Sequence, residues 1–179
     1  IVCLITFISY RRKLVHLAHQ LEADLNVVLG NVNLQTYISK KFPDAYIKGS
    51  TRSNIEKELE PIHSNIAESM RKMKMFLAKN EILASFLEDY ANMGSFIKTY
   101  NEKQQQAILM KNKDFFDHVL KYPLDNQQRR AIISEEDNCL VVSSAGSGKT
   151  SSIVGKVEYL TKIKHVNPQE ILLISYTQK

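Results

Sequence analysis

The chain of 179 residues has few cysteines and no pattern of residues typical of covalent catalysis. Its two cysteines, Cys3 and Cys139, are too few and too far apart for a disulfide scaffold or a zinc cluster, which fits a reducing compartment. No Ser/His/Asp or Cys/His arrangement suggests a covalent nucleophile. With 44% hydrophobic and 24% charged residues, the composition is that of a globular protein. It disfavours extended disorder, collagen-like repeats and a multi-span membrane protein.

Glycine is also scarce, and its distribution divides the chain. Three of the six glycines, Gly146, Gly148 and Gly155, fall within ten residues of one another. We place a boundary between residues 121 and 122, because Pro123 pushes its predecessor out of helical geometry. The net charge of +5 divides into +4 over residues 1–121 (17 basic, 13 acidic) and +1 over residues 122–179 (7 basic, 6 acidic). Most of the excess positive charge therefore lies away from the glycine cluster.

Residues 1–121 are predicted to form a helical region. Leucines at three- and four-residue steps predict a helix over residues 1–29, and Gly30 is a plausible stop. Residues 42–54 are rich in turn formers and are expected to form a loop. Further helices are expected over a segment that carries Ile62, Ile66, Met70, Met73 and Leu77 on one face, and over residues 82–90 and 95–120.

The amino-terminal ten residues, Ile1–Tyr10, are largely apolar and are followed at once by Arg11, Arg12 and Lys13. Ten residues cannot cross a bilayer, which needs about twenty. Two interpretations remain open. The stretch is either the inner end of a truncated membrane anchor with its positive flank in the cytoplasm, or a buried helix end. In both cases the protein is expected to be cytoplasmic, and in the first it is tethered to the membrane.

A phosphate-binding loop is predicted after the boundary. The run Asn138–Val142 is short, apolar and β-branched, as in a buried parallel strand. It is followed by the segment Ser-Ser-Ala-Gly-Ser-Gly-Lys-Thr at 143–150 and by a helical pattern over 151–161. Strand, glycine loop, lysine, hydroxyl and helix is the order that such a loop requires. The pattern departs from the general form at Ser143, where a glycine is usual; this is tolerable if the entry turn needs no positive φ.

The requirements of phosphate binding explain the residue types in this loop. Gly146 and Gly148 let the backbone curl so that its N–H groups point at phosphate oxygens. The helix amino terminus adds a positive dipole end. Lys149 would reach the β- and γ-phosphates, and Thr150 would hold the bridging Mg²⁺; both are the expected catalytic residues. The expected nucleotide-binding residues of the loop are Ser143, Ser144, Ala145, Gly146, Ser147, Gly148, Lys149, Thr150 and Ser151.

A second apolar run, Glu170–Tyr176, follows the predicted helix. The two runs and the helix between them predict a βαβ unit with parallel strands in a right-handed crossover. The expected fold class is therefore α/β: a helical region, then the first βαβ unit of a P-loop parallel sheet. Two parallel strands cannot cover themselves, so the unit is expected to be truncated, with more strands following in the complete protein.

Three motifs in order resemble the superfamily 1 DNA helicases of the UvrD/Rep type, and their helicase IV-like branch most. The segment 122–132, Tyr-Pro-Leu-Asp-Asn-Gln-Gln-Arg-Arg-Ala-Ile, resembles the Q motif, residues 144–151 resemble motif I, and residues 171–179 resemble motif Ia. The resemblance implies a RecA-like fold and an ATP- and Mg²⁺-dependent motor that moves 3′ to 5′ on single-stranded DNA. It also implies that Gln128 reads adenine and that Thr177 lies beside the DNA.

Residues 1–110 resemble no family that can be named. Two hypotheses from different functional classes therefore remain open for the protein. The first is the amino-terminal part of a helicase motor. The second is a nucleotide-gated switch whose helical region docks on a protein such as RNA polymerase, without unwinding. Because Glu158 and Glu170 are isolated and no Asp-Glu pair follows the loop, these 179 residues are expected to bind a nucleotide without hydrolysing it.

Overall fold

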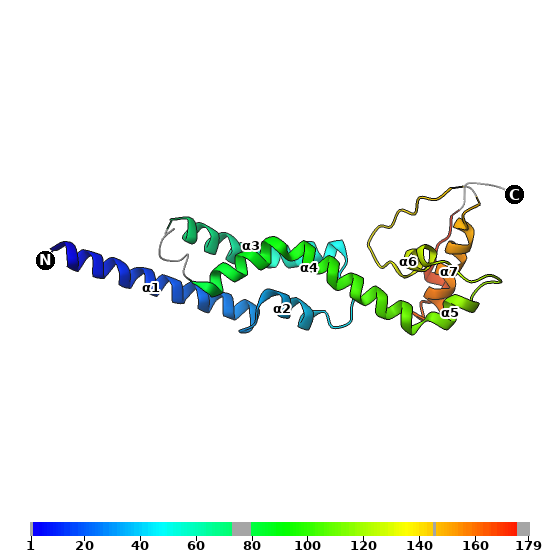
Figure 1. Ribbon diagram of the computed structural model, residues 1–179, viewed down its shortest axis with the longest axis horizontal. Coiled ribbons are helices and arrows are strands. Elements are labelled where there is room, and N and C mark those ends of the chain that lie inside the picture. Colours follow the sequence, from blue (N-terminus) through cyan, green and yellow to red (C-terminus); the bar gives the residue numbers. More distant parts are fainter. Residues whose placement is uncertain (1, 73–79, 145, 175–179) are drawn as a thin grey trace. The chain divides into compact units, whose positions relative to one another are not determined.

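The computed structural model describes residues 2–72, 80–144 and 146–174 (Figure 1). The chain consists of two compact units, Ile1–Asn101 and Glu102–Lys179, and each is described by itself. The division between the units lies inside the long helix α4 (Glu81–Lys111). The boundary at residues 121 and 122 rests on composition and motifs, and it remains a prediction.

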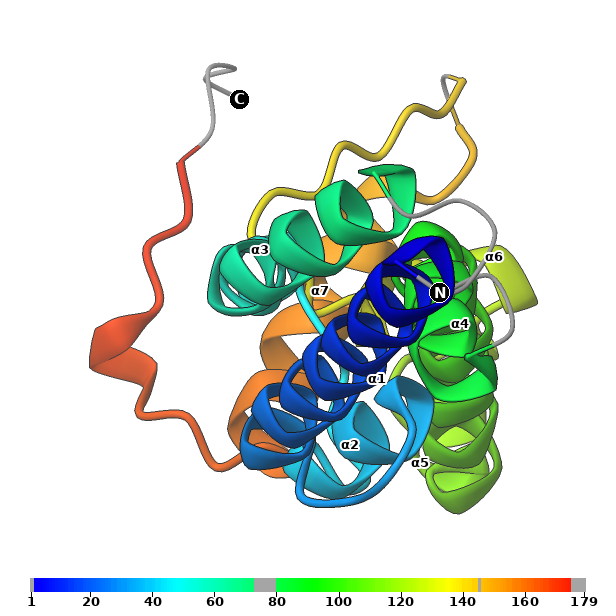
Figure 2. The same ribbon diagram turned by 90° about the vertical axis from the view of Figure 1, so that its left-hand side faces the viewer.

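The first unit is helical. It contains α1 (Val2–Leu29), α2 (Leu34–Lys41), α3 (Gly49–Lys72) and most of α4, and α1, α3 and α4 run alongside one another (Figures 1 and 2). Leu14, Leu21 and Leu25 are buried at the predicted helical spacing, so the apolar face of α1 is confirmed. The four helices share one core, which includes Leu21, Leu34, Ile38, Leu59, Ile66, Leu83 and Phe86.

The predicted ends of the helices are right in part. Helix α1 ends at Leu29, and Gly30 follows with a φ of +67°, a conformation that favours glycine. The loop expected over residues 42–54 is too long, because α3 begins at Gly49. The two helices expected over 82–90 and 95–120 are largely joined in α4, which runs through Gly94. A Cβ at Gly94 would lie 2.8 Å from the flexible end of the Arg52 side chain, and α4 continues through this glycine.

A single buried amide fixes the loop between α2 and α3. The Asn101 side chain donates to the carbonyl oxygen of Ile47 and accepts from its backbone N–H, both at 2.8 Å. Asn101 and Ile47 are both buried, so water cannot replace these two bonds. Asn101 therefore anchors the connecting loop to α4.

The second unit contains α5 (Lys113–His118), α6 (Asn126–Ile133), α7 (Lys149–Lys162) and the short 3₁₀ helix η2 (Pro168–Glu170). Its small core consists of Phe116, Leu124, Ile132, Ile133 and Tyr159. Helices α6 and α7 pack closely, because a Cβ at Gly155 would lie 2.7 Å from the Ile132 side chain. Gly155, which belongs to the glycine cluster, thus serves helix packing rather than the phosphate loop.

The expected βαβ sheet is not found, so the predicted α/β fold class is wrong for this structure. The helix between the two apolar runs is present as α7, but no β-strand occurs among residues 2–72, 80–144 and 146–174. Leu140 and Val142 are 88% and 86% exposed, and Leu172 and Ile174 are also exposed. A parallel strand forms when its backbone groups pair with a neighbour and helices cover its faces. Neither run finds such a partner in the part of the chain that is described.

The amino-terminal apolar stretch does not form a buried helix end over the side chains that are described. Phe7, Ile8 and Tyr10 are exposed along the first turns of α1. Among the described residues, no helix is both long and apolar enough to cross a membrane.

Candidate nucleotide-binding site

The loop between residues 143 and 149 has the backbone geometry that its glycines predict. Gly146 and Gly148 have φ values of +78° and +83°, in the left-handed region that favours glycine. Ser143 is not among the residues with positive φ, so the departure from the usual glycine at this position causes no backbone strain. The Ser143 hydroxyl is buried and has no hydrogen-bond partner among the described residues. It is therefore an unused donor at the entry of the loop.

Helix α7 begins directly after this loop with its amino terminus uncapped. Gly148 is the N-cap residue and supplies no side-chain hydrogen bond, and the first turn carries no acidic side chain. The first N–H groups of a helix lack intrahelical partners and attract anions. The amino terminus of α7 is therefore suited to a phosphate group.

The Lys149 side chain folds back over the loop. Its ammonium group donates to the carbonyl oxygens of Ser143 and Ser144, at 2.8 and 2.7 Å. The hydroxyl of Ser147 also donates to the Ser144 carbonyl, at 2.8 Å. These neutral acceptors are weaker partners for an ammonium ion than phosphate oxygens, because phosphate oxygens carry negative charge. Lys149 is thus held on the loop by bonds that a phosphate could replace.

Gln128 lies against the same loop. Its Oε1 atom accepts from the backbone N–H of Asp125 at 2.9 Å. In return, the Asp125 carboxylate accepts from the N–H groups of Gln127 and Gln128. Together these bonds form a capping box at the start of α6. The Gln128 Nε2 atom donates to the Ser147 carbonyl at 3.4 Å. A Cβ at Gly148 would lie 2.3 Å from this Nε2, so the glycine also makes room for the amide.

Two side chains that sequence analysis missed hold α6 in place. Lys156, on α7, donates to the carbonyl oxygens of Ile132 and Ser134, at 2.6 and 2.8 Å, at the end of α6. Burial lowers the pKa of Lys156. Arg129 donates to the Leu124 carbonyl and to the Asp117 carboxylate, both at 2.6 Å, and this donation lowers the pKa of Asp117. Sequence alone offers only the position of Arg129 beside Gln128 as a signal.

Two hollows adjoin the loop. One, of about 330 Å³, is lined by Gln128, by Thr150 and Ser151 of the first turn of α7, and by residues 120–124. The other, of about 370 Å³, includes Lys149, Lys156, Glu136 and Cys139. Within the described part of the chain, no group of three His, Cys, Asp or Glu side chains could hold a metal ion. A Mg²⁺ ion here would have to rely on Thr150, phosphate oxygens and water, which suits its preference for oxygen ligands.

The structure brings most of the expected site residues together. Gln128, Ser143, Ser144 and residues 146–151 lie in or beside the loop. Ala145 and Thr177, expected to contact nucleotide and DNA respectively, lie outside the described residues.

Comparisons with known proteins match this part of the chain. Residues 124–179 match the family model of the UvrD/REP helicase N-terminal domain. This segment is therefore similar to the amino-terminal domain of UvrD/REP helicases. The UvrD-like segment therefore begins just before α6 and includes the whole loop.

Similar curated proteins are DNA helicases. DNA helicase IV of Escherichia coli is 36% identical over 80 residues, which cover 45% of this chain and 12% of that protein. The helicase Rep of Buchnera aphidicola is 40% identical over 55 residues, and UvrD1 of Mycobacterium leprae is 39% identical over 56. Each of these two matches covers 31% of this chain, and 8% and 7% of the respective relatives. The chain thus spans a small fraction of their length, and no solved structure matches it.

Proposed function

We propose that this chain is the amino-terminal part of an ATP-dependent DNA helicase that moves 3′ to 5′ on single-stranded DNA, with ATP and Mg²⁺ bound at the loop 143–150. The observation that carries the proposal is the conformation of the loop. Two left-handed glycines, a lysine on loop carbonyls and an uncapped helix amino terminus occur together beside Gln128. The match of residues 124–179 to the family model of the UvrD/REP helicase N-terminal domain supports the helicase assignment.

Different residues of the site bind the phosphates, the Mg²⁺ ion and the adenine base. Lys149 exchanges the Ser143 and Ser144 carbonyls for phosphate oxygens, and the first N–H groups of α7 donate to the same group. Thr150 would be the protein ligand of Mg²⁺, which neutralises phosphate charge when bound. Gln128 keeps one amide hydrogen and one lone pair unused, so it can donate to N7 of adenine and accept from its N6 amine.

The test is nucleotide binding by the 179-residue chain and ATPase activity of the full-length protein with and without single-stranded DNA. Lys149→Ala should weaken ATP binding by about 10- to 100-fold, the value of a charge-assisted hydrogen bond. The matched control is Lys162→Ala on the same helix, whose side chain pairs with Glu158. Unchanged binding in Lys149→Ala would remove Lys149 from this role, and full-length ATPase activity indifferent to DNA would contradict the motor.

Thr177 is proposed to lie beside single-stranded DNA, because it stands in the segment that resembles motif Ia. In the full-length protein, Thr177→Ala should raise the DNA concentration needed for half-maximal ATPase stimulation. Basal ATPase activity should stay unchanged. A variant that responds to DNA as the unaltered protein does would contradict this assignment.

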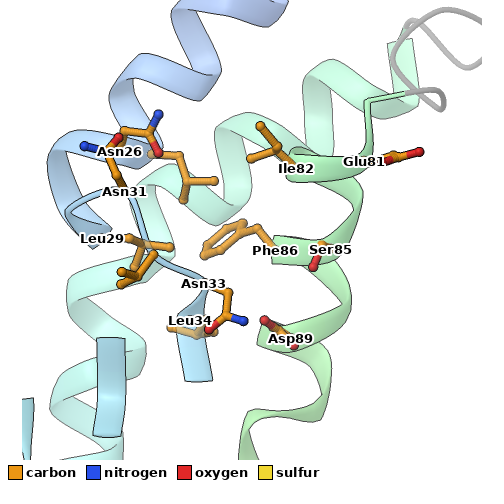
Figure 3. A pocket seen from close by; sticks show the side chains of 12 residues that line it. Asn26, Leu29, Asn31, Asn33, Leu34, Glu81, Ile82, Ser85, Phe86 and Asp89 are labelled. Atoms are coloured by element: carbon orange, nitrogen blue, oxygen red, sulfur yellow. The ribbon is translucent and has the colours of Figure 1, made fainter. Parts of the chain in front are cut away.

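A second candidate function, the nucleotide-gated interaction switch, is favoured by a pocket in the helical unit. The pocket has a volume of about 460 Å³ and is lined by residues of α1, of α4, of the turn between α1 and α2 and of the start of α2 (Figure 3). Leu29, Leu34 and Phe86 form its apolar wall, while Glu81 and Asp89 make its charged rim acidic. No basic side chain is among the residues that line it. Such a pocket suits an apolar side chain of a protein partner flanked by lysine or arginine.

This candidate predicts that purified RNA polymerase binds the chain and that Glu81→Lys weakens the complex, with Glu102→Lys on the same helix as control. Glu102 is exposed on α4 and does not line the pocket. Equal binding by both variants and the unaltered chain would contradict docking at this pocket.

A further inference from the structure

Tyr122 begins the segment that resembles the Q motif, and its side chain has no role assigned so far. The hollow of about 330 Å³ is lined on one side by Tyr122, Pro123 and Leu124 and on the other by the first turn of α7. Its volume is within the range of about 300–1,000 Å³ that is typical of small-molecule sites. Tyr122 is 72% exposed, which is unusual for a large aromatic side chain beside a core residue such as Leu124.

The Tyr122 side chain lines the hollow and is largely exposed, so it is accessible to a ligand. The Lys121 ammonium lies over the ring, 5.5 Å from its centroid, in a cation–π contact. Since the cation takes one face of the ring, a planar ligand would stack on the opposite face. The same hollow contains the Gln128 amide, which has one donor and one acceptor position unused. One wall thus offers a flat apolar surface, and the other offers hydrogen bonds to the edge of a planar group.

We propose that Tyr122 stacks on the nucleobase whose edge Gln128 reads, so that this hollow binds the base of the nucleotide. The inference rests on the proposed function, since it assumes that phosphates bind at Lys149. Thr150 and Ser151 line the hollow and follow Lys149 directly, so phosphate at the loop and base in the hollow belong to one continuous site. Any purine offers a face for stacking, whereas the selection of adenine belongs to Gln128.

The first experiment separates base binding from phosphate binding in the 179-residue chain. Affinities for ATP and for inorganic tripolyphosphate are measured by calorimetry for the unaltered chain and for Tyr122→Ala, Tyr122→Phe and Tyr10→Ala. Tyr122→Ala should weaken ATP binding by about 5- to 150-fold, as expected for the loss of one base–aromatic stack, and leave tripolyphosphate binding unchanged. Tyr122→Phe should keep ATP affinity, because the ring remains. Tyr10 is an exposed tyrosine of the helical unit and serves as the control.

The second experiment uses the absence of tryptophan from the chain. Tyr122→Trp introduces a single indole, and its fluorescence should be quenched by ATP but not by tripolyphosphate. The stacking role is overturned if Tyr122→Ala loses affinity for ATP and tripolyphosphate equally, or if its ATP affinity is unchanged. It is also overturned if ATP does not change the fluorescence of the Tyr122→Trp variant. In these cases the unaltered chain still binds ATP and the proposed function stands. Failure of the unaltered chain to bind either ligand overturns the proposed function itself.

Discussion

Gly148 serves the site in two ways at the scale of single residues. Its φ of +83° gives the loop its curl, and its missing side chain leaves space for the Gln128 amide. Gly146 has nearly the same φ, +78°, but nothing lies within 4 Å of the position where its Cβ would be. The two glycines therefore provide a matched pair that separates backbone strain from displacement of Gln128.

Gly148→Ala is expected to reduce ATP affinity relative to tripolyphosphate affinity, because a methyl group would force Gln128 away from the base. Gly146→Ala should strain the loop by a similar amount, about 1–2 kcal/mol for a left-handed residue with a side chain, without this change in ratio. Calorimetric titration of both variants with ATP and with tripolyphosphate measures the ratio of the two affinities. The same ratio in the two variants would mean that Gln128 does not depend on the space at Gly148.

At the scale of elements, the site depends on how α6 is fixed against α7. The capping box at Asp125 holds the start of α6, and Lys156 holds its end through two carbonyl oxygens. Partial burial lowers the pKa of Lys156 because it disfavours the charged form, and the ammonium group still donates to both carbonyl oxygens.

Lys156→Met should destabilise the second unit by about 1–3 kcal/mol. The methionine side chain has a similar length, but the carbonyl oxygens of Ile132 and Ser134 lose their hydrogen-bond donor. Lys162→Met, on the exposed side of α7, should change stability by less than about 0.5 kcal/mol. Urea unfolding followed by the fluorescence of a Tyr122→Trp background reports on this unit. Equal effects of the two substitutions would show that the carbonyl contacts contribute nothing.

Helix α4 has a comparable anchor in Asn101. Asn101→Leu should destabilise the helical unit by about 2–4 kcal/mol, since both backbone groups of the buried Ile47 lose their partners. Glu102→Leu at the neighbouring exposed position is the control. Loss of stability can be measured by circular dichroism during urea unfolding, and an unchanged midpoint in Asn101→Leu would contradict the anchoring role.

At the scale of the whole molecule, one ion pair of the second unit should make its stability depend on pH in acid. The hydrogen bond from Arg129 lowers the pKa of Asp117 below its usual 3.8, so folding favours the ionised carboxylate. This stabilisation is complete above the unfolded value and is lost as the pH falls through the folded value. The second unit should therefore lose it below about pH 4.

Asp117→Asn tests this dependence, because it removes the titrating group and keeps a partner for Arg129. The variant should flatten the decrease in stability of the second unit below pH 4, as measured by unfolding at pH 2.5–6 in the Tyr122→Trp background. Asp114→Asn, at an exposed position of the same helix, should retain the decrease. Parallel pH curves for Asp117→Asn and the unaltered chain would exclude the pair as the cause.

Local sequence determined much of the helical unit and the loop. The leucine spacing of α1, its stop at Gly30 and the left-handed glycines at 146 and 148 each depend on neighbours within a few residues, so pattern and backbone sterics suffice. These features could therefore be predicted without knowing what packs against them.

Tertiary structure decided what depends on residues far apart in the sequence. Whether Asn138–Val142 forms a strand depends on a hydrogen-bonding neighbour, which no local pattern supplies, and the described residues provide none. Other contacts also join residues that are 22 to 54 positions apart in the sequence. They are the approach of Arg52 to Gly94, the hydrogen bonds of Asn101 to Ile47 and those of Lys156 to the end of α6. The sequence by itself determined the left-handed glycines of the loop, whereas only the packed chain decided which side chains lie against it.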